Sequence, residues 1–200
     1  MAQKFFVSEE KRDPRVIEAA EKNLDRPLKV LDAALNQVRE AGLGIDDITK
    51  ENFCLADIED FIDQVRRELL DGRGFLMIRG WPVGDYSLDD IGAMYYGFGQ
   101  HFGKGASQSV IGDRLGYVMD HSDSDPLERA YRNKYELSLH TDLNELIGML
   151  NIRTAAEGGE SQYASALAVH NEILATRPDL LEPLYEGFHY HRRGDCLLYT

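Results

Sequence analysis

Hydrophobic residues in the first part of the chain recur at intervals of three and four, the spacing that places them on one face of a helix. Three such stripes occur, within residues 16–24, 30–38 and 58–69. Glycine pairs follow the second and third stripes, and glycine commonly ends a helix because it adopts left-handed backbone angles without strain. The pattern therefore predicts an N-terminal helical segment over residues 1–72.

A short strand and a further helix are expected next. Phe75–Ile78 is a run of apolar residues bounded by glycines, which favours a buried strand. Ser87 can begin a helix over residues 88–98, because its side-chain oxygen can accept from a backbone N–H of the first turn. Asp89 and Asp90 in that turn would complement the positive end of the helix dipole.

Residues 73–200 carry a different pattern, in which dense glycines give way to short strand-like runs. The predicted strands are 135–143, 146–153, 161–166, 188–191 and 196–200, and one helix is predicted at 168–177. This succession predicts an α+β domain with N-terminal and inserted helices. Because the chain stops within an apolar run, which would leave an exposed sheet edge, we expect residues 73–200 to be part of a larger β domain.

The sequence Leu139–His140–Thr141–Asp142–Leu143 carries the main candidate for chemistry. Residues two apart in a strand project from the same face, so His140 and Asp142 would point into one cavity. An imidazole and a carboxylate supply two corners of the facial triad of two histidines and one carboxylate that holds Fe(II). A His-x-Asp motif is short and also occurs by chance, so spacing alone leaves this role open.

The other histidines have weaker patterns. His121 begins a second His-x-Asp motif, but in a polar loop that ends in proline, which favours a surface position. His189 and His191 lie two apart on a predicted strand and could supply a further metal ligand, or simply form part of the strand. His101 and His170 are expected to have structural roles, His101 at a helix end where a cation is favoured.

Several segments, in their order and spacing, resemble the TauD/TfdA-type dioxygenases, which depend on Fe(II) and 2-oxoglutarate. The similarity covers roughly residues 71–195 and is much more specific than the His-x-Asp motif alone. The segments that carry it are Gly74–Gly80, Gly99–Gly103, Leu139–Leu143, Leu150–Ala155, Gly158–Ser161 and Val169–Leu184.

This resemblance implies a double-stranded β-helix, the jelly roll of clavaminate-synthase-like proteins. It also implies oxidative decarboxylation of 2-oxoglutarate to succinate and CO2, coupled to hydroxylation of a small organic molecule. Residue by residue, His140 and Asp142 correspond to two iron ligands and are the expected catalytic residues. Ser161 corresponds to a hydroxyl that contacts 2-oxoglutarate, at a position where the family often has threonine.

The chain also departs from the family pattern. The distal iron-binding histidine and the arginine that pairs with 2-oxoglutarate have no convincing counterpart within 200 residues, and we expect them in a missing C-terminal part. Two alternatives to a dioxygenase stay open. One is an inactive truncated jelly roll that serves as an interaction module. The other is a different metalloenzyme that uses His189 or His191 as its third ligand.

The composition excludes some classes of binding partner but does not identify a substrate. A net charge of −13 disfavours nucleic acid and anionic membranes, and no apolar run approaches a membrane span. The apolar patch Phe5–Val7 is too short for a signal-peptide core. Cys54 and Cys196 form no recognisable motif, so a reducing cytoplasm is the simplest expectation. We expect a small-molecule substrate and leave a homo-oligomer possible.

Overall fold

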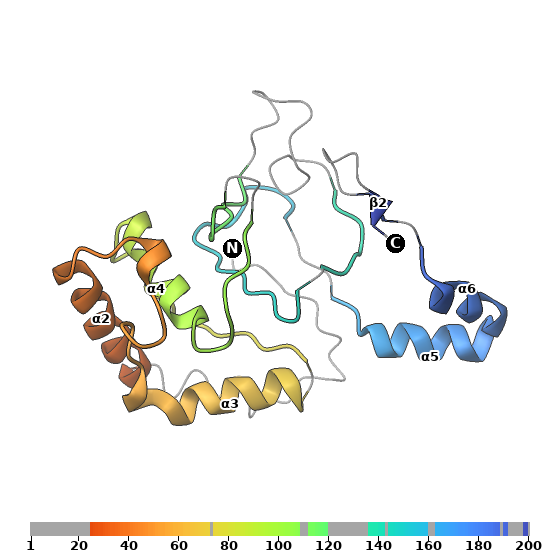
Figure 1. Cartoon of the computed structure of the whole chain (residues 1–200), viewed down its shortest axis with the longest axis horizontal. Coiled ribbons are helices and arrows are strands. Elements are labelled where there is room, and N and C mark those ends of the chain that lie inside the picture. Colours follow the sequence, from red (N-terminus) through yellow and green to blue (C-terminus); the bar gives the residue numbers. More distant parts are fainter. Residues whose placement is uncertain are drawn as a thin grey trace. The chain divides into compact units, whose positions relative to one another are not determined.

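The computed structural model describes residues 25–72, 74–108, 112–119, 136–142, 144–159, 163–188, 190–191 and 198–199. Its helices and strands are α2 (Asp25–Glu40), η2 (Ile45–Asp47), η3 (Ala56–Ile58), α3 (Glu59–Leu70), α4 (Leu88–Gly99), α5 (Ala166–Thr176), η5 (Pro178–Leu180), α6 (Leu181–Glu186), β1 (Tyr190–His191) and β2 (Leu198–Tyr199) (Figure 1). The chain divides into two compact units, and the described residues up to Glu157 belong to the first and those from Gly158 to the second.

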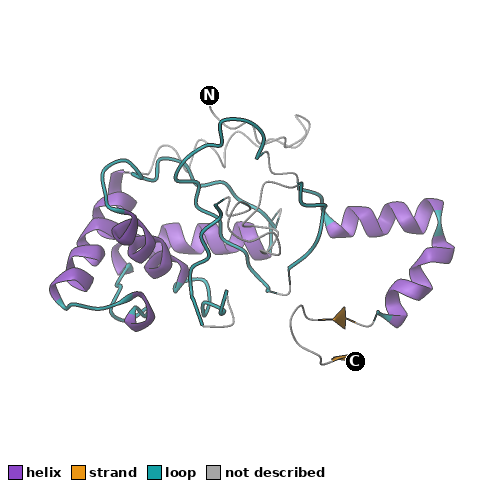
Figure 2. Cartoon of the chain, turned by 90° about the horizontal axis from the view of Figure 1, so that it is seen from above, coloured by secondary structure: helices purple, strands orange, loops and turns teal. Residues whose placement is uncertain are grey.

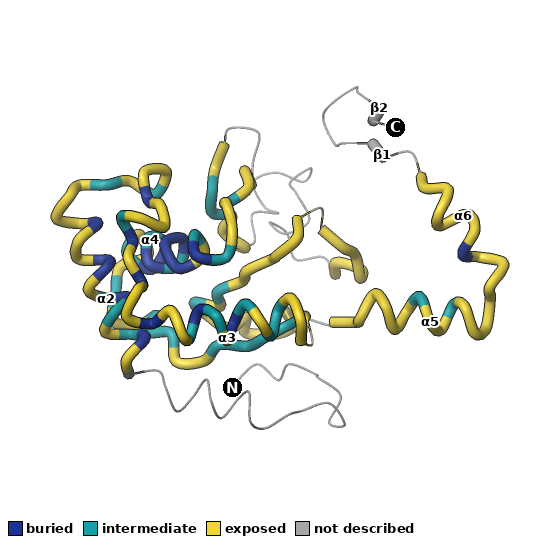
Figure 3. Tube along the Cα trace, turned by 60° about the horizontal axis from the view of Figure 1, so that its bottom comes forward, coloured by how far each residue is buried: buried dark blue, intermediate teal, exposed yellow. Residues whose placement is uncertain are grey.

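The first unit is built around α2, α3 and α4. The apolar stripes predicted for α2 and α3 are confirmed, because their members enter one buried cluster with residues of α4 and of the segment before η3. Figure 3 shows that burial is most continuous along α4. The buried residues are Leu31, Ala34, Leu35, Val38, Ile48, Phe53, Leu55, Ile58, Ile62, Met94, Tyr96 and Phe98. Removal of these side chains from water is the main source of stability in this unit.

The helix ends follow from local chemistry. Gly42, just after α2, has a φ of 64°, a left-handed conformation that glycine adopts without a Cβ clash. Ser87 caps α4 as predicted, and its Oγ accepts from the backbone N–H of Asp90 at 3.2 Å. None of the helices in the described parts of the chain has the length and apolar composition to span a membrane. The predicted helix at 16–24 lies outside the described residues.

Polar contacts join α2 to α4 at the edge of this core. Arg39, in the last turn of α2, donates to Asp90 of α4 from its Nε at 2.8 Å and also pairs with it through Nη2. Tyr86 donates its hydroxyl to Asp32 of α2 at 2.8 Å. The two helices therefore share both an apolar contact and a charged contact.

The predicted strands differ most from the structure. Within the described residues of 75–78, 136–142 and 146–153, the chain is irregular and forms no strand ladder, as the loops in Figure 2 show. Phe75–Ile78 is half-buried instead of buried. A ladder needs a partner strand with matching hydrogen-bonding groups, and local alternation of residues cannot supply that partner. The jelly roll expected from the sequence is thus not seen as a sheet in these residues.

The second unit contains a helical hairpin and a short ladder. The predicted helix at 168–177 is confirmed as α5, which begins at Ala166 because Ser165 caps it by accepting from the Ala168 N–H. Because α5 begins at Ala166, the strand predicted at 161–166 is wrong at its last residue. β1 and β2 pair antiparallel, with Tyr190 opposite Tyr199, so the last two predicted strands are confirmed in part.

Candidate metal site

His140 and Asp142 lie close together, although neither is in a strand. The Nε2 atom of His140 is 3.9 Å from Oδ1 of Asp142, and the two side chains are about half exposed, at 49% and 52%. This distance is beyond an ordinary hydrogen bond, which joins heavy atoms at about 2.7–3.2 Å. The predicted convergence of the two side chains is therefore found, but the extended strand that was its expected cause is absent from the described residues.

The ring of His140 is oriented by its own backbone. Its Nδ1 atom is 2.8 Å from the carbonyl oxygen of Ser138. A carbonyl oxygen only accepts hydrogen bonds, so Nδ1 carries the proton and donates. In the neutral ring the lone pair is then on Nε2, the atom that faces Asp142. The pair thus presents a nitrogen lone pair and a carboxylate oxygen to the same small volume.

The chain that follows this pair passes over α4. A Cβ added at Gly148 would lie only 2.4 Å from the hydroxyl oxygen of Tyr95, so the backbone at Gly148 approaches that side chain closely. Burial raises the pKa of Tyr95 to about 12, and its ring packs edge-to-face with Trp81 at a centroid distance of 6.2 Å. Tyr95 therefore remains neutral at physiological pH and fixes the segment after Asp142 against the helical core.

Apolar side chains around the pair are exposed. Leu137 and Leu139 on one side, and Ile147 and Met149 on the other, all lie in contact with solvent. His140 and Asp142 are thus flanked in the sequence by exposed apolar residues.

A third ligand is not part of this arrangement. Among the residues that the structure describes, no three His, Cys, Asp or Glu side chains come together as a metal-binding group. Ser161, His189 and the second motif at His121 lie outside the described residues. His191 lies in β1, where only its backbone is described. The roles predicted for Ser161, His189 and His191 therefore stay predictions.

The structural roles predicted for His101 and His170 agree with their contacts. His101 is buried, and its Nε2 lies 2.8 Å from the carbonyl oxygen of Phe53. Burial lowers the pKa of His101, so the neutral ring is favoured and not the cation expected at a helix end. His170 in α5 lies 2.8 Å from the hydroxyl of Tyr185 in α6 and thereby links the two helices.

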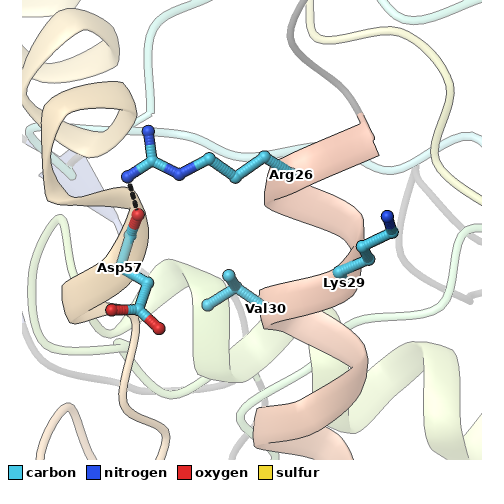
Figure 4. A pocket seen from close by; sticks show the side chains of 4 residues that line it. All are labelled: Arg26, Lys29, Val30 and Asp57. Carbon is cyan, nitrogen blue, oxygen red and sulfur yellow. Dashed lines mark hydrogen bonds between the residues drawn. The ribbon is translucent and has the colours of Figure 1, made fainter.

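A shallow hollow lined by Arg26, Lys29, Val30 and Asp57 lies between α2 and the segment around η3 (Figure 4). Arg26 spans it and donates to the backbone carbonyl of Asp57, and it also pairs with Asp60 at 3.3 Å. The guanidinium of Arg26 is engaged in these two contacts, which link α2 to η3 and α3 across the hollow. It contains neither His140 nor Asp142.

Comparison with known proteins identifies the family of the chain. The model of the family described as "Taurine catabolism dioxygenase TauD, TfdA family" matches residues 24–197. The match covers most of the chain, which therefore belongs to the TauD/TfdA family. No solved structure matches the chain.

Two curated relatives are similar over most of this chain. The FR-33289 synthase of Streptomyces rubellomurinus is 27% identical over 170 residues, which are 84% of this chain and 50% of the relative. The taurine hydroxylase-like protein SAT17 of Stachybotrys chartarum is 26% identical over 166 residues, which are 78% of this chain and 43% of the relative. The chain thus spans about half the length of the curated relatives it matches.

Proposed function

We propose that this chain supplies His140 and Asp142 as two protein ligands of Fe(II) in a 2-oxoglutarate-dependent oxygenase. The observation that carries the proposal is the pair of acceptor atoms, Nε2 and Oδ1, which face each other at 3.9 Å. The Ser138 carbonyl, which accepts from Nδ1, holds the ring in the tautomer that a metal ligand needs. Membership of the TauD/TfdA family supports the same chemistry.

The charge of Asp142 and the distance between the two ligand atoms both suit a divalent cation. A carboxylate oxygen and a nitrogen lone pair at this separation, with no proton donor holding them together, are matched by a cation placed between them. Two ligands at about 2.1 Å from a metal and at right angles are about 3 Å apart. The present separation is within about 1 Å of that value, which rotation of two half-exposed side chains can close.

When bound, Fe(II) with 2-oxoglutarate would supply the oxidative chemistry, giving succinate and CO2 and a hydroxylated small organic molecule. The contribution of this chain is to hold two ligands at fixed orientation and to leave coordination positions open. The Ser161 hydroxyl is the proposed contact to 2-oxoglutarate. The jelly roll implied by the family remains part of this proposal.

The proposal is tested by an anaerobic titration of the chain with Fe(II), followed by NMR of the ring protons of its six histidines. Paramagnetic broadening should affect His140 at the lowest iron concentration, and the Asp142→Ala variant should require at least about tenfold more iron, because one of two ligands is lost. Earlier broadening of His101 or His170, or an unchanged titration in the Asp142→Ala variant, would contradict the proposal.

The same titration distinguishes this proposal from the alternative, a different metalloenzyme with His189 or His191 as its third ligand. If His189 or His191 completes the site, its ring protons should broaden together with those of His140. A His189→Ala, His191→Ala double variant would then bind iron more weakly. Equal binding by the double variant and the wild-type chain would remove both histidines from the ligand set.

A further inference from the structure

α4 makes close contacts on two opposite sides. On one side the ring of Phe53 lies against Gly97. Tyr95 precedes Gly97 by two residues, about 200° around the helix, so its side chain leaves α4 on the other side. There the backbone at Gly148 comes so close that an added Cβ would be 2.4 Å from the Tyr95 hydroxyl oxygen. This second contact joins α4 to a residue six positions after Asp142.

The Tyr95 ring is held in place by other aromatic side chains. Trp81 packs edge-to-face with Tyr95 at a centroid distance of 6.2 Å and with Phe98 at 5.6 Å. Phe98 belongs to the buried cluster of the first unit, and Trp81 packs against that cluster. Packed aromatic rings have little free space into which they can rotate. Crowding between Tyr95 and Gly148 would therefore displace the chain at Gly148, which is exposed, and not the ring.

We propose that Tyr95 is a positioning residue that holds His140 and Asp142 within reach of one cation, by fixing where the chain after them lies. The described residues from 136 to 149 are all exposed, and a segment with little burial has little local stability of its own. Such a segment needs contacts with the core to keep two ligands in one orientation, and Gly148 provides one. The inference rests on the proposed function and deepens it, because it names a helical residue that acts on the ligands through another residue.

The test introduces a clash at this contact and then relieves it. Gly148 has no positive φ, so alanine suits its backbone, and the new methyl group overlaps the Tyr95 hydroxyl. When Tyr95→Phe removes that oxygen, the nearest atom is Cζ of the ring at 3.4 Å, an ordinary contact. Gly148→Ala should therefore displace His140 and Asp142, and the Gly148→Ala, Tyr95→Phe double variant should restore them.

Two measurements on the 200-residue chain follow this displacement. The first is NMR of the His140 ring protons without metal, and Gly148→Ala should shift these signals while the double variant returns them to their wild-type positions. The second is the anaerobic Fe(II) titration, in which Gly148→Ala should require at least about tenfold more iron. The double variant should bind iron within about twofold of the wild-type chain. Tyr95→Phe alone should weaken binding less than Gly148→Ala does, because the ring remains.

Two alanine variants serve as controls and should leave the His140 signals unchanged. Nothing lies within 4 Å of a Cβ at Gly103, and Gly97→Ala crowds Phe53 on the opposite side of α4, which separates positioning from a general loss of stability. Unchanged His140 signals in Gly148→Ala, no restoration in the double variant, or the same shift in Gly97→Ala would overturn the proposal. If iron does not broaden His140 in the wild-type chain, the proposed function fails, while the metal-free signals still decide the role of Tyr95.

Discussion

The ring of Phe53 lies against the backbone of Gly97 in α4, so that a Cβ at Gly97 would be 2.4 Å from the ring. Phe53 is completely buried, and its carbonyl oxygen contacts His101 just beyond the helix. The segment before η3 is thus fixed to the last turns of α4 by one close packing contact and one hydrogen bond.

Gly97→Ala is therefore expected to destabilise the first unit by about 1–3 kcal/mol, because the new methyl group overlaps the Phe53 ring. Urea unfolding of the two proteins measures the difference. Gly99→Ala is the control, because nothing lies within 4 Å of a Cβ at Gly99. That change should be neutral or stabilise by up to about 1 kcal/mol, through helix propensity alone. Equal effects of the two substitutions would show that Phe53 does not pack as described.

The contact between Arg39 and Asp90 predicts loss of stability in acid. The hydrogen bonds from Arg39 and Ser87 lower the pKa of Asp90 from 3.8 to about 2. The charged form is favoured in the folded state, so its contribution is complete above pH 4 and is lost as pH falls from about 4 to 2. The contribution is about 1–2 kcal/mol after allowance for partial exposure.

Thermal unfolding between pH 2 and pH 7 checks this. Asp90→Asn should lower the melting temperature at pH 7 and weaken its decrease between pH 4 and pH 2, compared with the wild-type chain. Asp89→Asn, an exposed position in the same turn, should follow the wild-type curve. If the melting temperature of Asp90→Asn decreased between pH 4 and pH 2 as much as that of the wild-type chain, the role assigned to the contact between Arg39 and Asp90 would be contradicted.

His101 predicts a second, milder dependence on pH. Burial lowers its pKa below 6.5, so the unfolded chain binds this proton more readily than the folded protein. Stability is then greatest above about pH 6.5 and decreases as pH falls below it. His101→Gln can still donate to the Phe53 carbonyl but cannot titrate, so its stability should change less between pH 7 and pH 5. The same slope in His101→Gln and in the wild-type chain would contradict this role of His101.

The helices could be predicted from the sequence because their determinants are local. Apolar spacing marks the buried sides of α2 and α3, and Ser87 marks the start of α4 by a hydrogen bond within one turn. The depth of the contact between Phe53 and Gly97 could not be predicted, since it joins residues distant along the chain. A glycine in the largely apolar last turns of the predicted helix was the only available signal.

The proximity of His140 and Asp142 was predicted from the sequence, but the backbone conformation that carries them was not. The His-x-Asp spacing placed His140 and Asp142 together, and their side chains do converge. The expected strand did not appear in the described residues, because sheet pairing depends on partner segments that local alternation does not specify. The Ser138 carbonyl that orients His140 was missed, since a backbone acceptor leaves no trace in the sequence.

The central claim is that His140 and Asp142 hold Fe(II) for chemistry with 2-oxoglutarate, and one titration tests it most directly. Fe(II) and 2-oxoglutarate are added to the chain without oxygen, and the visible charge-transfer band of the chelated ketoacid is recorded. The account predicts that a band formed by the wild-type chain persists in His121→Ala, which alters the other His-x-Asp motif, and is lost in His140→Ala. Such a band would also mean that the third ligand lies within these 200 residues, at His189 or His191. A band that persists in His140→Ala, or that His121→Ala removes, would contradict it.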